Sequence, residues 1–122
     1  MANPAQLKAL AYGSLLLSVG HALTGRKFQK LRRFQELPSL AYTCSTVGWY
    51  QGSGYLILIA LLNFQWASNP QALEEPLNRA IAGLITLIAW GSSISYLRGG
   101  VVSSGLITAA AGAIHGWITL RN

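Results

Sequence analysis

The sequence predicts an all-α protein, an integral membrane four-helix bundle with a short amphipathic interfacial segment between its first two spans. Two observations predict this class. Charged residues make up 10% of the chain and hydrophobic residues 52%, whereas soluble domains carry about 25% charged residues. A bilayer core of about 30 Å needs roughly 20 apolar helical residues, and four stretches of the 122-residue chain meet that requirement. They are residues 7–23, 40–66, 77–97 and 101–120, and together they form one predicted transmembrane domain.

The first span is followed by the most basic segment of the chain. The first and third loops hold most of the nine Lys and Arg residues, and the others are Lys8, Arg79 and Arg121. Because basic residues in short loops favour the cytoplasm, both termini are expected on the non-cytoplasmic side. The alternative for the first span is a cleaved signal peptide, with the small residues Gly20 and Ala22 near its cleavage site.

The first loop, residues 24–38, combines basic and apolar residues in a repeating pattern. Phe28, Leu31, Phe34 and Leu37 recur every three residues, and basic residues fill the positions between them. A short helix lying in the headgroup layer would bury this apolar edge and present its charges to anionic lipid. The alternative is an ordinary positively charged loop that contains several apolar residues.

The second span carries the most distinctive local segment, Gly48-Trp-Tyr-Gln-Gly-Ser-Gly-Tyr55. Its glycines loosen the helix around Gln51, whose amide is expected near the bilayer midplane among two tyrosines and a tryptophan. A few polar groups among aromatic side chains are typical of a small-molecule site. The alternative is a kinked helix in which Gln51 only bonds a neighbouring hydroxyl group.

A tight connection and small residues predict how the later spans pack. Only Arg98-Gly-Gly100 separates the third and fourth spans, so these two helices are expected to be antiparallel neighbours. Gly112-Ala-Ile-His-Gly116 in the fourth span and Gly48-Trp-Tyr-Gln-Gly52 in the second are GxxxG motifs, which let helix backbones approach closely. They favour packing within the bundle, and oligomerisation is the alternative.

Each span also carries a polar stripe, and the four stripes are expected to turn inward. An unsatisfied polar group in hydrocarbon costs several kcal/mol, so these side chains should meet one another rather than lipid. The predicted result is an interior pocket with hydrogen-bonding groups and aromatic walls, which suits a lipophilic small molecule. Its predicted ligand-binding residues are Trp49, Tyr50, Asn63, Trp90, Ser93 and Thr108.

Four residues within the spans are candidates for acid–base chemistry. Histidine titrates near neutral pH and serves readily as a general acid or base. The predicted catalytic set is His21, Gln51, Tyr55 and His115, and the alternative is that both histidines only pack and hydrogen-bond. We expect no metal and no cofactor, because one cysteine, Cys44, and spans without central carboxylates leave no set of metal ligands.

Short motifs along nearly the whole chain carry a resemblance to a known family. They are Ser18-Val-Gly-His21, Gly48-Trp-Tyr-Gln-Gly-Ser-Gly54, Asn78-Arg-Ala-Ile-Ala-Gly83 and His115-Gly-Trp117. In these motifs the chain resembles the DoxX-like group of small four-span membrane proteins. The resemblance implies a four-span fold. Some members of that group are tied to quinone or redox functions, and others assist other membrane proteins.

The sequence therefore predicts a small integral membrane protein with an intramembrane pocket for a lipophilic small molecule, and it leaves open whether the protein is a cofactor-independent enzyme. One alternative is an accessory or assembly subunit of a larger membrane complex. A second is an oligomeric small-molecule transporter, which the missing central carboxylate disfavours. The expected partners are the lipid bilayer, the lipophilic ligand, and either further copies of the chain or a membrane complex. Nucleic acid is not expected, because the positive charge is concentrated in one loop.

Overall fold

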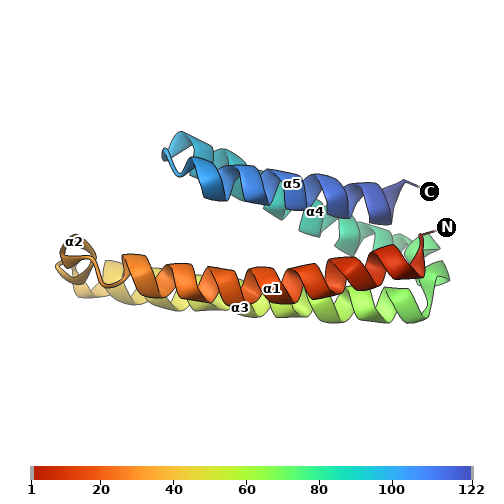
Figure 1. The fold of residues 1–122 in the computed structure, drawn as a ribbon, viewed down its shortest axis with the longest axis horizontal. Coiled ribbons are helices and arrows are strands. Elements are labelled where there is room, and N and C mark those ends of the chain that lie inside the picture. Colours follow the sequence, from red (N-terminus) through yellow and green to blue (C-terminus); the bar gives the residue numbers. More distant parts are fainter. Residues whose placement is uncertain (1, 122) are drawn as a thin grey trace. The chain divides into compact units, whose positions relative to one another are not determined.

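The computed structural model describes residues 2–121, and its regular elements are helices (Figure 1). In chain order they are α1 (Pro4–Phe28), α2 (Arg32–Gln35), α3 (Ser39–Ser68), the 3₁₀ helix η1 (Pro70–Glu74), α4 (Pro76–Arg98) and α5 (Val102–Leu120). The all-α prediction is confirmed.

The chain packs as two compact units. The first, here the α1–α3 unit, is Ala9–Asn63, and the second, the α4–α5 unit, is Met1–Lys8 together with Phe64–Asn122. The prediction of a single transmembrane domain stays a prediction. Each predicted span lies in one long helix, and three of the four agree with the helix bounds to within two residues at each end.

The first helix differs most from its predicted span. It runs to Phe28, five residues beyond the predicted end at residue 23, and carries Arg26 and Lys27 in its last turn. Cations there are favourable, because the carboxyl end of a helix carries partial negative charge. The loop contains one short helix, α2 (Arg32–Gln35), while its first residues continue α1. The placement of this segment at a membrane interface stays a prediction. α3 continues without a break through the three glycines around Gln51.

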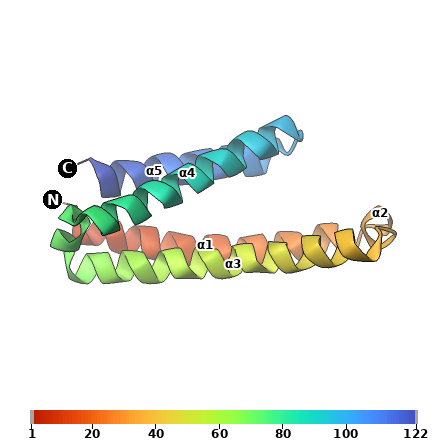
Figure 2. The same ribbon diagram turned by 180° about the vertical axis from the view of Figure 1, so that it is seen from behind.

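The α4–α5 unit contains a helical hairpin (Figure 2). Two backbone hydrogen bonds define its turn. Gly100 adopts a φ of 77°, which only glycine takes without strain. The Val101 amide donates to the Tyr96 carbonyl over 2.9 Å, and the Gly100 amide donates to Leu97 over 3.1 Å. This pair of bonds is a Schellman motif, which satisfies carbonyls at the end of α4 and lets α5 start at once.

Hydrogen bonds also fix the start of α4 against the end of α3. The Trp66 indole donates to Asn78 Oδ1 over 3.0 Å, and the Asn78 amide group donates to Glu75 over 2.9 Å. Leu73 of η1 is fully buried beside this network. The polar groups of the connection are thus paired within the same unit, and α4 begins at Pro76, a favourable first helical residue.

The described helices expose many large apolar side chains and bury several polar ones. Leu16, Leu40 and Leu77 are 74%, 78% and 72% exposed, whereas Leu7, Trp66 and Leu73 are fully buried. The buried polar residues include Ser14, Ser18, Ser53, Asn63, Thr86, Ser93, His115 and Thr119.

Among the described helices, α4 is the one that is long and apolar enough to cross a membrane. Its most apolar stretch has a mean hydropathy of 1.6, and 22% of that stretch is buried.

Candidate functional site

A groove runs along the seam between α4 and α5. It has a volume of about 580 Å³. The α4 side consists of Gly83, Thr86, Leu87 and Trp90, and the α5 side of Ala113, Gly116, Trp117 and Leu120, followed by Arg121. Both sets follow the spacing i, i+3, i+4 and i+7, which places each set along one face of its helix. The groove is therefore built by two matching helix faces.

Glycines, which have no side chain, form part of the base of this groove. A Cβ atom at Gly116 would lie 3.0 Å from Thr86 Cγ2, and one at Gly112 would lie 2.7 Å from Trp90 Cδ1, so both helices approach closely at these positions. A Cβ atom at Gly83 would meet nothing within 4 Å. Because Gly83 lines the groove, the space above it is part of the groove itself.

The indole side chains of two tryptophans form the sides of the groove. Trp90 is 46% exposed and Trp117 is 67% exposed, and both line the groove. Flat aromatic surfaces beside an apolar floor give a large contact area for a hydrocarbon ligand. Trp90 was predicted to bind ligand from the sequence, whereas Trp117 was missing from the predicted set.

A hydrogen-bonded pair lies at the Thr86 position of the groove. The Thr86 hydroxyl donates to the Ala82 carbonyl over 3.0 Å, and Thr86 Oγ1 lies 3.3 Å from His115 Nδ1. Since the hydroxyl proton is already donated, His115 Nδ1 must carry a hydrogen and donate to Thr86. The bare lone pair of neutral His115 is then on Nε2, which is buried and has no partner.

The groove ends at a cation. Arg121 lies at the carboxyl end of α5, where its guanidinium donates to Gln6 Oε1 over 3.1 Å and lies 5.7 Å from the centre of the Trp117 ring. Both of these partners are uncharged. Nearby, the Arg79 guanidinium donates to the Leu120 carbonyl over 3.4 Å and so helps to cap α5. An apolar groove with a positive end can accept an elongated molecule that is polar at one end only.

A second cluster of predicted residues joins the two long helices of the α1–α3 unit. The His21 and Trp49 rings are stacked, with centroids 4.0 Å apart and an angle of 7° between their planes. Trp49 Nε1 donates to the His21 carbonyl over 2.7 Å, and His21 Nδ1 shares a hydrogen bond of 3.0 Å with Ser53 Oγ. A Cβ atom at Gly25 would overlap the Trp49 indole. These contacts use His21 and Trp49 to hold α1 against α3.

Aromatic contacts extend this cluster into the basic loop. Phe28 packs edge-on against Trp49 at 4.7 Å and against Phe34 at 5.2 Å, and Phe34 lies 5.3 Å from Tyr42. Two of the apolar residues that the sequence assigned to the edge of an interfacial helix, Phe28 and Phe34, therefore pack on α3. Tyr50, predicted to bind ligand, donates to Gln29 Oε1 over 3.0 Å at the same end.

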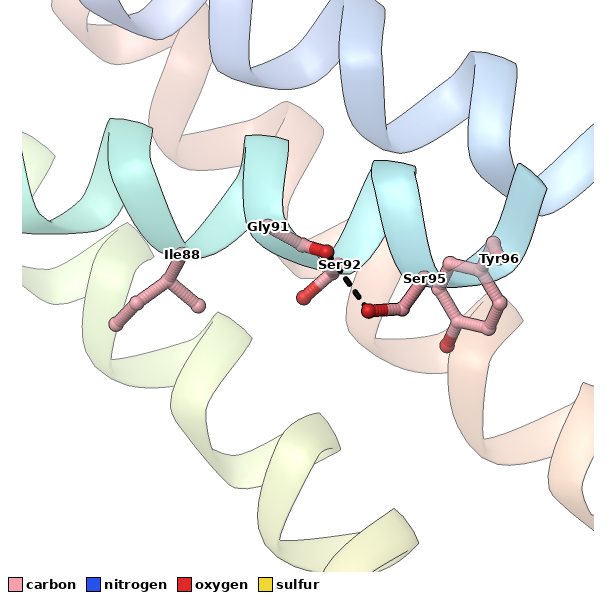
Figure 3. A pocket seen from close by; sticks show the side chains of 5 residues that line it. All are labelled: Ile88, Gly91, Ser92, Ser95 and Tyr96. Atoms are coloured by element: carbon pink, nitrogen blue, oxygen red, sulfur yellow. Dashed lines mark hydrogen bonds between the residues drawn. The ribbon is translucent and has the colours of Figure 1, made fainter. Parts of the chain in front are cut away.

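α4 also carries a small polar hollow (Figure 3). Its side chains are Ile88, Ser92, Ser95 and Tyr96, with Gly91 between them. The Ser95 hydroxyl donates to the Gly91 carbonyl over 3.0 Å, drawn as a dashed line in Figure 3. All of these residues come from one helix, so the hollow has a single wall and offers a ligand little enclosure.

The remaining predicted site residues are spread over both units. Gln51 lies on an exposed face of α3, and Tyr55 is partly buried with a hydroxyl that has no partner. Asn63 donates to the Ile59 carbonyl over 2.9 Å, and its Oδ1 has no partner. Ser93 donates to the Gly105 carbonyl over 2.7 Å across the hairpin, and Thr108 donates to Ser104 within its own helix. Ser93 and Thr108 therefore serve the fold of the hairpin.

Sequence reasoning missed most of the groove. Gly83, Gly116, Trp117 and Arg121 were absent from the predicted site. The available signal was the same i, i+3, i+4, i+7 spacing of small and aromatic residues on two helices joined by a tight turn. Within residues 2–121, no three His, Cys, Asp or Glu side chains lie close enough together to hold a metal ion.

Comparison of the chain with known protein families, curated proteins and solved structures found no match. The resemblance to the DoxX-like group stays a prediction.

Proposed function

We propose that this chain is an integral membrane protein that binds a lipophilic small molecule in the groove between α4 and α5. The observation that carries the proposal is the groove itself, an apolar channel with a glycine floor, exposed indole sides and one cation at its end. Its volume of about 580 Å³ falls within the range of about 300 to 1,000 Å³ for small-molecule sites.

The hydrogen bonds of the serine and threonine hydroxyl groups support a location in the membrane. Several serine and threonine hydroxyls donate to the carbonyl four residues earlier in their own helix, where lipid offers no other acceptor. Ser14, Thr24, Thr86, Ser95, Thr108 and Thr119 do so, over 2.7 to 3.0 Å. The large exposed leucines on the same helices would face hydrocarbon at no cost.

The proposed topology has four spans, formed by α1, α3, α4 and α5, with both termini on the non-cytoplasmic side. Its support is the concentration of basic residues at the end of α1 and between α1 and α3, together with Arg98 at the end of α4. In this topology Arg121 and Trp117 lie at the non-cytoplasmic end of α5. An indole and a guanidinium are both favourable in the interface.

The test of the proposed function is native mass spectrometry of the full chain released gently from membranes, followed by organic extraction of the molecule that co-purifies. Gly83→Leu should fill the groove without a clash, because a Cβ atom there meets nothing within 4 Å. Gly91→Leu is the matched control, since it lies on the same helix, has equally open surroundings and is outside the groove.

The expected result is a discrete bound molecule in the wild type and in Gly91→Leu. The fraction of protein that carries it should be at least tenfold lower in Gly83→Leu. Equal occupancy in all three proteins would place the ligand elsewhere and overturn the proposal. An empty chain that leaves the membrane only together with another protein would also overturn it, and would favour an accessory role in a larger complex.

A further inference from the structure

We infer that the ligand of the α4–α5 groove is an amphiphile with an anionic head, which pairs with Arg121, and a hydrocarbon chain that lies between Trp90 and Trp117. This inference rests on the proposed function, because it names the class of molecule that the same groove takes. Three features of the groove lead to it.

The first feature is the incomplete use of the Arg121 guanidinium. A guanidinium carries five N–H donors in a planar fork that matches the oxygens of a carboxylate or phosphate. In the described part of the chain, one bond goes to Gln6 Oε1, and the Trp117 ring lies 5.7 Å away. Neither partner neutralises the charge. Because Arg121 is exposed, its remaining donors are accessible, and an anionic oxygen at the end of the groove would give them an acceptor of opposite charge.

The second feature is the lack of a free donor along the groove at Thr86. Its hydroxyl proton is donated to the Ala82 carbonyl, and its oxygen accepts from His115. A ligand with a polar group at this depth would lose its hydrogen bonds to water and gain none from Thr86. Thr86 therefore gives the ligand no hydrogen bond at this depth, whereas the Arg121 guanidinium offers donors at the end of the groove.

The third feature is the shape. From Gly83 to Trp90 the groove follows α4 for seven residues, which at 1.5 Å per residue is a length of about 10 Å. An open apolar groove of this length, lined by two indoles, suits an extended hydrocarbon chain. The head is either the carboxylate of a fatty acid or the phosphate of a phospholipid, since both present anionic oxygens to a guanidinium.

The experiment is a native mass spectrometry titration of the full chain in a neutral detergent with four probes. Oleate and oleyl alcohol share one chain and differ in the charge of the head, and phosphatidylglycerol and phosphatidylcholine make the same comparison for phospholipids. We expect oleate to bind at least tenfold more tightly than oleyl alcohol, or phosphatidylglycerol at least tenfold more tightly than phosphatidylcholine. The pair that shows the preference identifies the source of the head.

Arg121→Gln should abolish this preference and leave the binding of the neutral probe unchanged. Arg98→Gln is the control, because it removes an exposed arginine from the far end of α4 and should keep the preference. A preference that survives Arg121→Gln, or neutral and anionic probes that bind equally to the wild type, would overturn the inference.

Gly83→Leu separates this inference from the proposed function. If Gly83→Leu removes all binding while Arg121→Gln changes nothing, the groove is the binding site and only the anionic head is wrong. If neither substitution changes the binding of any probe, the groove is not the site, and both the inference and the proposed function fail.

Discussion

The two helical pairs of this protein pack in different ways. α1 and α3 are held by rings, with His21 stacked on Trp49 and hydrogen-bonded to Ser53. α4 and α5 are held by small residues, since Gly112 and Gly116 allow close approach to α4. Rings fill the space between helices at a few points. Glycines let the two backbones approach closely. The large side chains next to them then line a groove, which is why the groove lies in the α4–α5 pair.

The two helical pairs would differ most if only one of them crossed the membrane. Leu16 lies at the middle of α1 and Leu84 near the middle of α4, and they are 74% and 58% exposed. If both helices span, Leu16→Lys and Leu84→Lys should each raise the apparent free energy of insertion by about 3 kcal/mol. A glycosylation-reporter insertion assay measures this. An effect of Leu84→Lys alone would show that α4 spans and α1 does not.

The ring-based packing of α1 on α3 should fail when Gly25 gains a methyl group. A Cβ atom there overlaps the Trp49 indole, so Gly25→Ala should lower the free energy of unfolding by about 2 kcal/mol. Gly20→Ala on the same helix meets nothing within 4 Å and should be neutral or stabilising by up to about 1 kcal/mol. Denaturation in mixed micelles compares the two, and equal stabilities would mean that Trp49 is not packed on Gly25.

Loss of the hydrogen bond between Thr86 of α4 and His115 of α5 should lower the stability nearly as much. Thr86→Val keeps the shape of the side chain but leaves His115 Nδ1 without an acceptor, at a cost of about 1 to 2 kcal/mol. Thr108→Val is the control, because the Thr108 hydroxyl bonds only carbonyls of its own helix. The same denaturation assay measures both variants. A loss for Thr108→Val as large as that for Thr86→Val would argue against the contact between helices.

The smallest expected effect concerns the matching contact in the α1–α3 unit. Ser53→Ala removes the hydroxyl that His21 bonds but keeps the Ser53 carbonyl, which accepts from Ser18 over 2.8 Å. Since His21 is only partly buried, the expected loss is about 1 kcal/mol. Ser45→Ala, on an exposed part of α3, should change stability by less than about 0.5 kcal/mol. Equal losses of stability in the two variants would show that the Ser53 hydroxyl does not help to hold His21.

The sequence predicted the long helices well, whereas its site residues stay a prediction. Apolar runs, Pro76 and the Arg98-Gly-Gly100 turn located three helices to within two residues at each end, because these are local signals. The end of α1 was missed, since Phe28 is held in the helix by a distant partner, Trp49. Among the predicted site residues, Trp90 lines the groove, whereas Gln51 lies on an exposed face.

The amino-acid sequence by itself determined the all-helical class and the positions of the long helices, because an apolar run with few charges satisfies its backbone groups within one helix. Only the tertiary structure decided that Gly83, Trp90, Trp117 and Arg121 share one groove and that Thr86 and His115 pair beside it. The physical reason is that exposure and contact depend on which faces of two helices meet. That choice follows from the packing of whole surfaces rather than from any one segment.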